Sequence, residues 1–148
     1  MRHLWSSAAV LAIVLGCSDN SPSTPTDPIA AIAGSWTIQA WDLRDVNHPT
    51  NRVDRVAAGF GGTLRVTASG AFTVSLTFLG QPDADPLVGT LTIHGDTLGF
   101  HTADGDVLIR FSIASGIMTW DTLEPEIFDL DGDDVLDQVV EHMVFRHD

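Results

Sequence analysis

The chain contains no lysine, and its seven arginines face 20 Asp and Glu residues, which gives a formal net charge of −13. Nucleic-acid binding depends on Lys and Arg side chains that neutralise phosphates, and docking on anionic lipid depends on a basic patch. This composition argues against both. Of the 148 residues, 44% are hydrophobic and only 18% are charged, so the chain is not an acidic disordered polymer. Its length suits one domain with a core of its own.

Sequence motifs of catalysis are also missing. There is no G-x-S-x-G nucleophile motif, and the glycine-rich stretch at residues 59–62 leads into an expected strand, whereas a phosphate-binding loop leads into a helix. Carboxylate pairs such as Glu124 and Glu126 lie in an acidic stretch with no sign of a pocket. The scattered histidines lack the spacing of zinc ligands; they are His48, His94, His101, His142 and His147. We therefore expect a protein that is not an enzyme.

An apolar run near the N-terminus is too short to span a membrane. It covers residues 8–16 and follows Arg2 and His3, whereas a bilayer-spanning helix needs about 20 residues. The run ends in Leu15-Gly16-Cys17, and Cys17 is the only cysteine in the chain. This segment resembles the lipobox of bacterial lipoproteins, in which the cysteine is acylated and becomes the new N-terminus. The alternative is an ordinary signal peptide with an incidental cysteine.

The lipoprotein resemblance implies a signal peptide over residues 1–16 and a lipid anchor on Cys17, which would leave the mature domain without a thiol. Because Ser18 and not Asp follows Cys17, the sorting rule of enterobacterial lipoproteins favours the outer membrane of a bacterial envelope. Residues 17–28 are then the lipidated cysteine and a tether rich in Pro, Ser and Thr, which favours extended chain of roughly 30 Å at most. The folded domain is expected over residues 29–148.

The rest of the chain reads as antiparallel β-structure. Over residues 71–79, apolar side chains alternate with Thr and Ser, which is the period of a strand buried on one face. Residues 107–113 alternate in the same way, and Gly-containing turn signals separate such runs. No segment sustains helical periodicity. The expected strands cover residues 35–41, 63–68, 71–79, 88–93, 97–102, 107–113, 117–122 and 138–146.

Eight short strands with hairpin spacing predict an all-β, eight-stranded antiparallel up-and-down β-barrel. Closure of the barrel removes exposed edges, which a chain without lysine could not protect with edge lysines. An immunoglobulin-like sandwich is the alternative. An eight-stranded barrel is just wide enough to be filled by its own side chains or to hold one small ligand. Long connections are expected over residues 42–62, 80–87 and 123–137.

The start of the first expected strand, Gly34-Ser35-Trp36, resembles the G-x-W opening of lipocalins and of lipocalin-like bacterial lipoproteins. The resemblance covers residues 34–146. It implies that Trp36 closes one end of the barrel and that Arg146, late in the last strand, packs across its ring as a cation–π pair. It also implies a small hydrophobic ligand inside the barrel. Lipocalins carry a helix before their last strand, and here an Asp-rich loop takes its place.

That loop has the spacing of a calcium site. Carboxylates recur at Asp129, Asp131, Asp133 and Asp137, and Val135 would add its backbone carbonyl. The spacing is closer to the strand-flanked calcium loops of β-propeller repeats than to an EF-hand. Between residues 121 and 141 there are nine acidic residues and no Arg or Lys, so repulsion favours a structural Ca²⁺ ion. A solvated acidic loop without metal is the alternative.

These features predict a lipid-anchored envelope protein that binds a small hydrophobic ligand or lipid, with a structural calcium loop. The alternative is a filled barrel that presents its loops to a protein or envelope partner. A packed interior would exclude the first function. An enzyme would show itself by carboxylates or histidines that converge in the mouth of the barrel.

Overall fold

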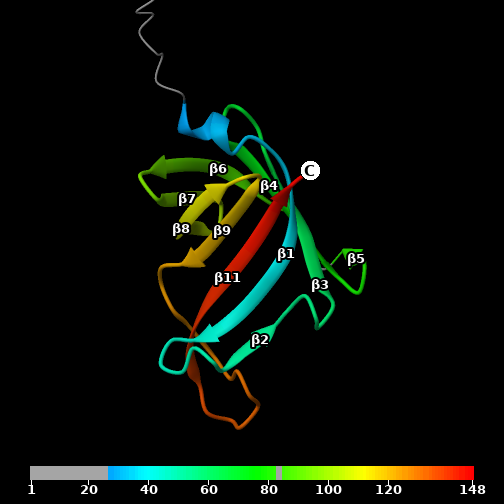
Figure 1. Ribbon diagram of the computed structural model, residues 1–148, viewed down its shortest axis with the longest axis vertical. Coiled ribbons are helices and arrows are strands. Elements are labelled where there is room, and N and C mark those ends of the chain that lie inside the picture. The colour runs from blue at the N-terminus through cyan, green and yellow to red at the C-terminus, as the bar shows by residue number, and fades with distance from the viewer. Residues whose placement is uncertain (1–26, 83–84) are drawn as a thin grey trace, which may run out of the picture.

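The protein folds into a closed antiparallel β-barrel. In the computed structural model, which describes residues 27–82 and 85–148, eight strands follow one another around the barrel in sequence order, and the last pairs with the first (Figure 1). The predicted eight-stranded barrel and all eight predicted strands are confirmed. The strands are β1 (Gly34–Asp45), β3 (Phe60–Val66), β4 (Ala71–Phe78), β6 (Leu87–His94), β7 (Thr97–Thr102), β8 (Gly105–Ala114), β9 (Ile117–Thr122) and β11 (Asp137–His147).

The predicted signal peptide, Cys17 and nearly all of the tether lie outside the described residues. Within the part of the chain that is described, no helix is both long and apolar enough to cross a bilayer.

Strand β1 is longer than predicted because its alternation of inward and outward side chains shifts by one residue partway along the strand. Its register with β11 shifts between Ile38 and Ala40. A β-bulge at this point inserts one residue, so that both Ile38 and Trp41 are buried although strict alternation would place them on opposite faces. The strand then continues to Asp45, four residues beyond the end that the alternation predicted.

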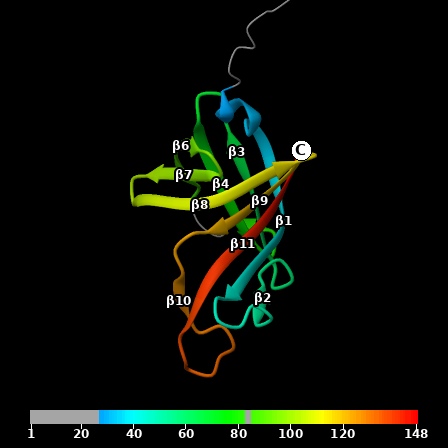
Figure 2. The same ribbon diagram turned by 60° about the vertical axis from the view of Figure 1, so that its left-hand side comes forward.

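Three shorter strands lie in segments that were expected to be connections. Strand β2 (Arg52–Asp54) pairs with β1, β5 (Gln81–Pro82) with β4, and β10 (Glu126–Phe128) with β11. Strands β1 and β11 both run on past the barrel wall, and β2 and β10 cover the edges that this extension exposes. Figure 2 shows β10 beside β11, above the long loop that connects them.

One end of the barrel is closed. The 3₁₀ turn η1 (Pro28–Ala31) lies over it, and the following Ile32 is fully buried. The indole Nε1 of Trp36 donates a hydrogen bond to the Ile32 carbonyl at 2.9 Å. Trp36 is itself 1% exposed, so the G-x-W tryptophan does lie at a closed end.

The partner of Trp36 is His147 and not Arg146. The rings of Trp36 and His147 meet edge to face, with centroids 4.7 Å apart and planes at 84°. Arg146 is exposed and lies opposite Thr37 in the β1–β11 ladder. Because side chains alternate along a strand, Phe145 points inward and Arg146 outward. The predicted cation–π pair is therefore corrected to an aromatic contact with the next residue.

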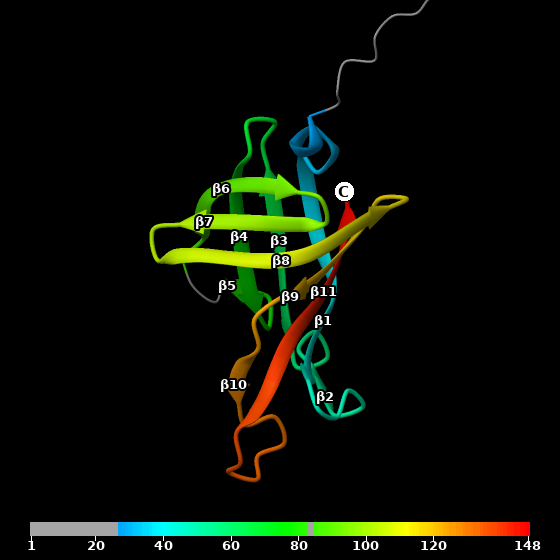
Figure 3. The ribbon, with the colours of Figure 1, turned by 90° about the vertical axis from the view of Figure 1, so that its left-hand side faces the viewer.

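The other end of the barrel is open. Strand β6 pairs with β4 only up to Val74, and β8 pairs with β9 only from Ile109 onward. Figure 3 shows β6, β7 and β8 crossing the upper half of the molecule, while β1 and β11 extend well below them. Side chains from the longer strands therefore surround a space that the shorter strands do not cover.

Candidate binding cavity

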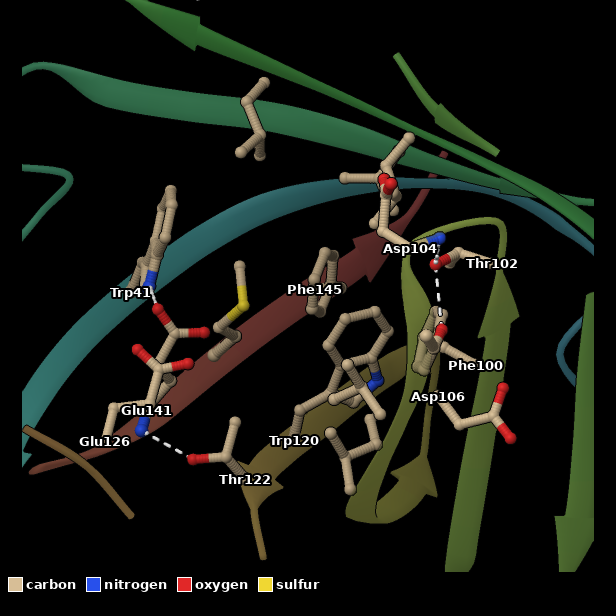
Figure 4. Close-up of a pocket in the computed structure, with 17 residues that line it drawn as sticks. Trp41, Phe100, Thr102, Asp104, Asp106, Trp120, Thr122, Glu126, Glu141 and Phe145 are labelled. Carbon is tan, nitrogen blue, oxygen red and sulfur yellow. Dashed lines mark hydrogen bonds between the residues drawn. The ribbon is translucent and has the colours of Figure 1, made fainter. Parts of the chain in front are cut away.

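A cavity of about 420 Å³ occupies the open half of the barrel. Its walls come from β1, β4, β7, β8, β9 and β11, with one residue each from β6 and β10 (Figure 4). Most of the wall is apolar. The lining residues are Trp41, Val74, Leu76, Leu87, Phe100, Thr102, Asp104, Gly105, Asp106, Val107, Ile109, Trp120, Thr122, Glu126, Glu141, Met143 and Phe145.

Aromatic rings form the boundary between the cavity and the packed core. Phe72, Phe100, Trp120 and Phe145 make a continuous series of contacts, with ring centroids 4.8, 5.0 and 4.3 Å apart. On one side of this series the core is filled as far as Trp36, and on the other lies the cavity. The Nε1 atom of Trp120 is buried and has no hydrogen-bond partner among the described residues.

Glu141 places a carboxylate on the inner face of β11. The neighbouring inward positions hold the buried residues Val139 and Met143. The Glu141 carboxylate accepts a hydrogen bond from Trp41 Nε1 at 3.3 Å. The backbone N–H of Glu141 donates to the Thr122 hydroxyl at 2.9 Å. Burial raises the pKa of Glu141, and its bond from Trp41 acts in the opposite direction.

A second carboxylate, Glu126, reaches the cavity from β10 (Figure 4). Its charge raises the pKa of Glu141 further. Asp104 and Asp106 line the opposite side, where the Asp106 carboxylate lies 2.9 Å from His101 Nδ1. The mouth of the barrel therefore collects four carboxylates.

Arg55 lies near this group without joining it. Its guanidinium carbon is 5.0 Å from the centre of the Trp41 ring and 4.2 Å from that of Phe60. Its charge lowers the pKa of Glu141, yet no ion pair joins the two within the described chain, and Arg55 is not a lining residue. Arg55 thus supports Trp41 from beside the cavity.

A second hollow of about 320 Å³ adjoins the cavity at its side. It shares Asp106, Val107, Thr122 and Glu126 with the cavity lining. These residues border the gap left where the start of β8 is not paired with β9. The second hollow therefore adjoins the cavity along this lateral gap.

The acidic loop between β10 and β11 brings three of its carboxylates together. Oxygens of Asp129, Asp131 and Asp133 all lie within 4.8 Å of one another. The charge of Asp133 is the largest of the causes that raise the pKa of Asp131. This is the local repulsion that the sequence predicted.

Two more ligands were predicted, the carboxylate of Asp137 and the backbone carbonyl of Val135. Asp137 accepts a hydrogen bond from the Leu130 backbone N–H at 3.2 Å. The Val135 N–H donates to Asp133 at 2.8 Å, and the Val135 side chain is exposed. The structure therefore groups the carboxylates of Asp129, Asp131 and Asp133, and the charge of Asp137 is near enough to raise the pKa of Asp131 as well.

The sequence of β11 contains an indication of the cavity that was not recognised, a charged residue on the inward face of the strand. Residues 139, 141, 143 and 145 share the inward face, and only Glu141 among them is charged. A carboxylate at a core position is costly unless it has a function or a partner. Glu126 carried no such signal, because its role depends on the short strand β10.

Comparison of the chain with protein-family models finds no match, and comparison with curated proteins finds none either. The lipocalin resemblance therefore rests on the G-x-W opening and the closed eight-stranded barrel.

Proposed function

We propose that this protein is a lipid-anchored protein of the bacterial cell envelope whose barrel binds a small hydrophobic ligand. The observation that carries the proposal is the 420 Å³ cavity with its largely aromatic and aliphatic wall. Small-molecule sites typically have volumes of roughly 300–1,000 Å³ and walls of this kind. The described part of the chain begins at the closed end, at η1, so a tether attached there would leave the cavity mouth directed away from the membrane (Figure 1).

The alternative function, a filled barrel that acts only through its loops, requires a packed interior. The cavity argues against it. Titration of the purified mature domain with Nile red, a neutral apolar fluorophore, tests the proposal. We expect saturable binding with a blue-shifted emission, at one site per chain. Emission that stays that of the dye in water at every protein concentration would contradict a hydrophobic binding function.

A second candidate function, acid–base catalysis, is favoured by Glu126 and Glu141. A carboxyl group of raised pKa beside a second carboxylate is the pair that such enzymes use. Among the described lining residues the hydroxyls are those of Thr102 and Thr122, and no histidine is present, so we place binding first. Recovery of the bound ligand unchanged after long incubation supports binding, whereas conversion that is lost in Glu141→Gln would support catalysis.

The acidic loop is proposed to hold a structural Ca²⁺ ion through Asp129, Asp131 and Asp133. Their convergent oxygens are the hard ligands that Ca²⁺ prefers. The ion would neutralise repulsion beside Leu130, which packs on Leu43 and Val139 in a small second core.

Calcium is expected to stabilise the protein. At about 100 times the dissociation constant, one bound ion adds about 2.7 kcal/mol to the free energy of unfolding and raises Tm. The effect should weaken as the pH falls through the pKa of Asp131, because protons compete for the same oxygens. Thermal unfolding with Ca²⁺ or EDTA measures it. Asp131→Asn should remove the response and Asp85→Asn, an exposed residue outside the loop, should keep it; a Tm indifferent to both additives contradicts the site.

A further inference from the structure

The polar groups of the cavity restrict the chemistry of its ligand. A carboxylate offers about four acceptor positions on its two oxygens. The side chain of Glu141 uses one of them, in the 3.3 Å bond from Trp41 Nε1. A purely apolar ligand would remove water from the remaining positions without replacing its hydrogen bonds, at a cost in affinity. The ligand that satisfies Glu141 therefore brings a hydrogen-bond donor.

The charge of the cavity wall favours a donor that is also a cation. Four carboxylates line the cavity, those of Asp104, Asp106, Glu126 and Glu141, and within the described lining no side chain is Arg, Lys or His. Asp106 has His101 as a partner, and Arg55 is stacked on Trp41 and Phe60. An anion such as a fatty acid would meet uncompensated negative charge here, whereas a cation would relieve the repulsion between Glu126 and Glu141.

The aromatic wall suits a cation as well. Trp41 stands directly beside Glu141, and its ring borders the cavity (Figure 4). Ammonium groups bind favourably over the faces of Trp and other aromatic rings. Phe100, Trp120 and Phe145 continue the wall away from Glu141 and Glu126, as an apolar surface for the rest of a ligand (Figure 4).

We propose that the cavity binds a hydrophobic amine in its protonated form, with the ammonium group between Trp41 and the carboxylates of Glu141 and Glu126, and the apolar body against Phe100, Trp120 and Phe145. This inference rests on the proposed binding function and names the ligand class.

Three ligands of equal chain length test the head group: octylamine, octan-1-ol and octanoate, each titrated calorimetrically into the mature domain at neutral pH. We expect octylamine to bind at least about tenfold more tightly than octan-1-ol, the size of one charge-assisted hydrogen bond, and octanoate to bind most weakly. Equal affinities for the amine and the alcohol, or a preference for octanoate, would overturn the amine inference while the hydrophobic binding function stands. Failure of all three, together with Nile red, would overturn both.

Variants locate the ammonium site. Glu141→Gln should lower the affinity for octylamine by about tenfold or more and leave that for octan-1-ol within a factor of two or so. Glu126→Gln should act in the same direction and more weakly, and it keeps the test available if the first variant folds poorly. Asp85→Asn removes an equal charge from the surface outside the cavity and should change neither affinity. An equal loss in Asp85→Asn and Glu141→Gln would mean that net charge alone attracts the amine.

The pH dependence of the affinity for octylamine provides an independent test. Glu141 is faced by Trp41 from β1, Thr122 from β9, Glu126 from β10 and the nearby charge of Arg55, while its neighbour His142 is paired with Asp121 at 2.7 Å. The affinity for octylamine should fall as the pH drops through the raised pKa of Glu141, because the protonated carboxyl no longer attracts an ammonium group. The profile should flatten in Glu141→Gln, and an unchanged profile there would contradict the assignment.

Discussion

Trp36→Ala is expected to lower the free energy of unfolding by about 3–5 kcal/mol, the range measured for loss of a buried Phe or Trp side chain. Trp36 is 1% exposed, donates a hydrogen bond to the Ile32 carbonyl and packs against His147. Its removal leaves a void at the closed end and an unpaired carbonyl beneath η1. A domain of this size has a total stability of about 5–15 kcal/mol, so the loss is a large part of it.

Urea unfolding measures this change, and Trp41→Ala is the matched control. The Trp41 ring borders the cavity, so part of it already faces space without protein atoms. Its truncation should therefore cost less than that of Trp36. A Trp36→Ala variant as stable as Trp41→Ala would contradict the view that one end of the barrel is packed and the other open.

Val74→Phe is expected to lower the affinity for Nile red by about a hundredfold, because its ring would fill space that the ligand needs. Val74 is a half-buried residue of β4 at the cavity wall. Enlarging a side chain in a packed core usually costs 1–3 kcal/mol. Here the ring enters an existing cavity, and we expect a change in stability of less than about 1 kcal/mol by the same comparison.

Fluorescence titration and urea unfolding of the same sample separate the two effects. Thr73→Phe adds the same ring at the neighbouring position of β4, opposite Arg65, on the outer face of the barrel. It should leave the affinity unchanged. Unaltered binding in Val74→Phe, with the protein folded, would place the bound dye outside the cavity.

The barrel itself was predictable from alternation. In β4 the apolar residues Phe72, Val74 and Leu76 recur at every second position, and a strand buried on one face needs nothing more. The bulge between Ile38 and Ala40 was not predictable, because the inserted residue breaks the period that reveals a strand. For that reason the extension of β1 and its pairing with β2 were missed.

The predicted pair of Trp36 and Arg146 shows how far a short motif reaches. The motif Gly34-Ser35-Trp36 identified the tryptophan that is buried at the closed end. It did so because the local sequence determines that the side chain of Trp36, near the start of β1, points into the barrel. The ring that meets it is set by the register of β11, where His147 and not Arg146 lies opposite Trp36. A shift of one residue changes the face of a side chain, and composition near the C-terminus does not fix that register.

The cavity lay beyond what the sequence could specify. Phe100, Trp120 and Phe145 are large enough to fill an eight-stranded barrel, and only the short pairing of β6 with β4 and of β8 with β9 leaves space beside them. Glu141 was the residue from which the open interior could have been inferred. The grouping of Asp129, Asp131 and Asp133 followed from their spacing, whereas the hydrogen bond from the Leu130 N–H to Asp137 depends on the fold of the loop.

Native mass spectrometry of the mature protein, purified from cell envelopes without denaturation, shows whether the barrel carries a ligand. We expect a species heavier than the lipidated polypeptide by one small organic molecule, which is released on denaturation and is absent from Val74→Phe. A wild-type protein that carries no added mass, and takes up neither Nile red nor any of the three octyl compounds, would contradict the claim that the barrel is a binding protein.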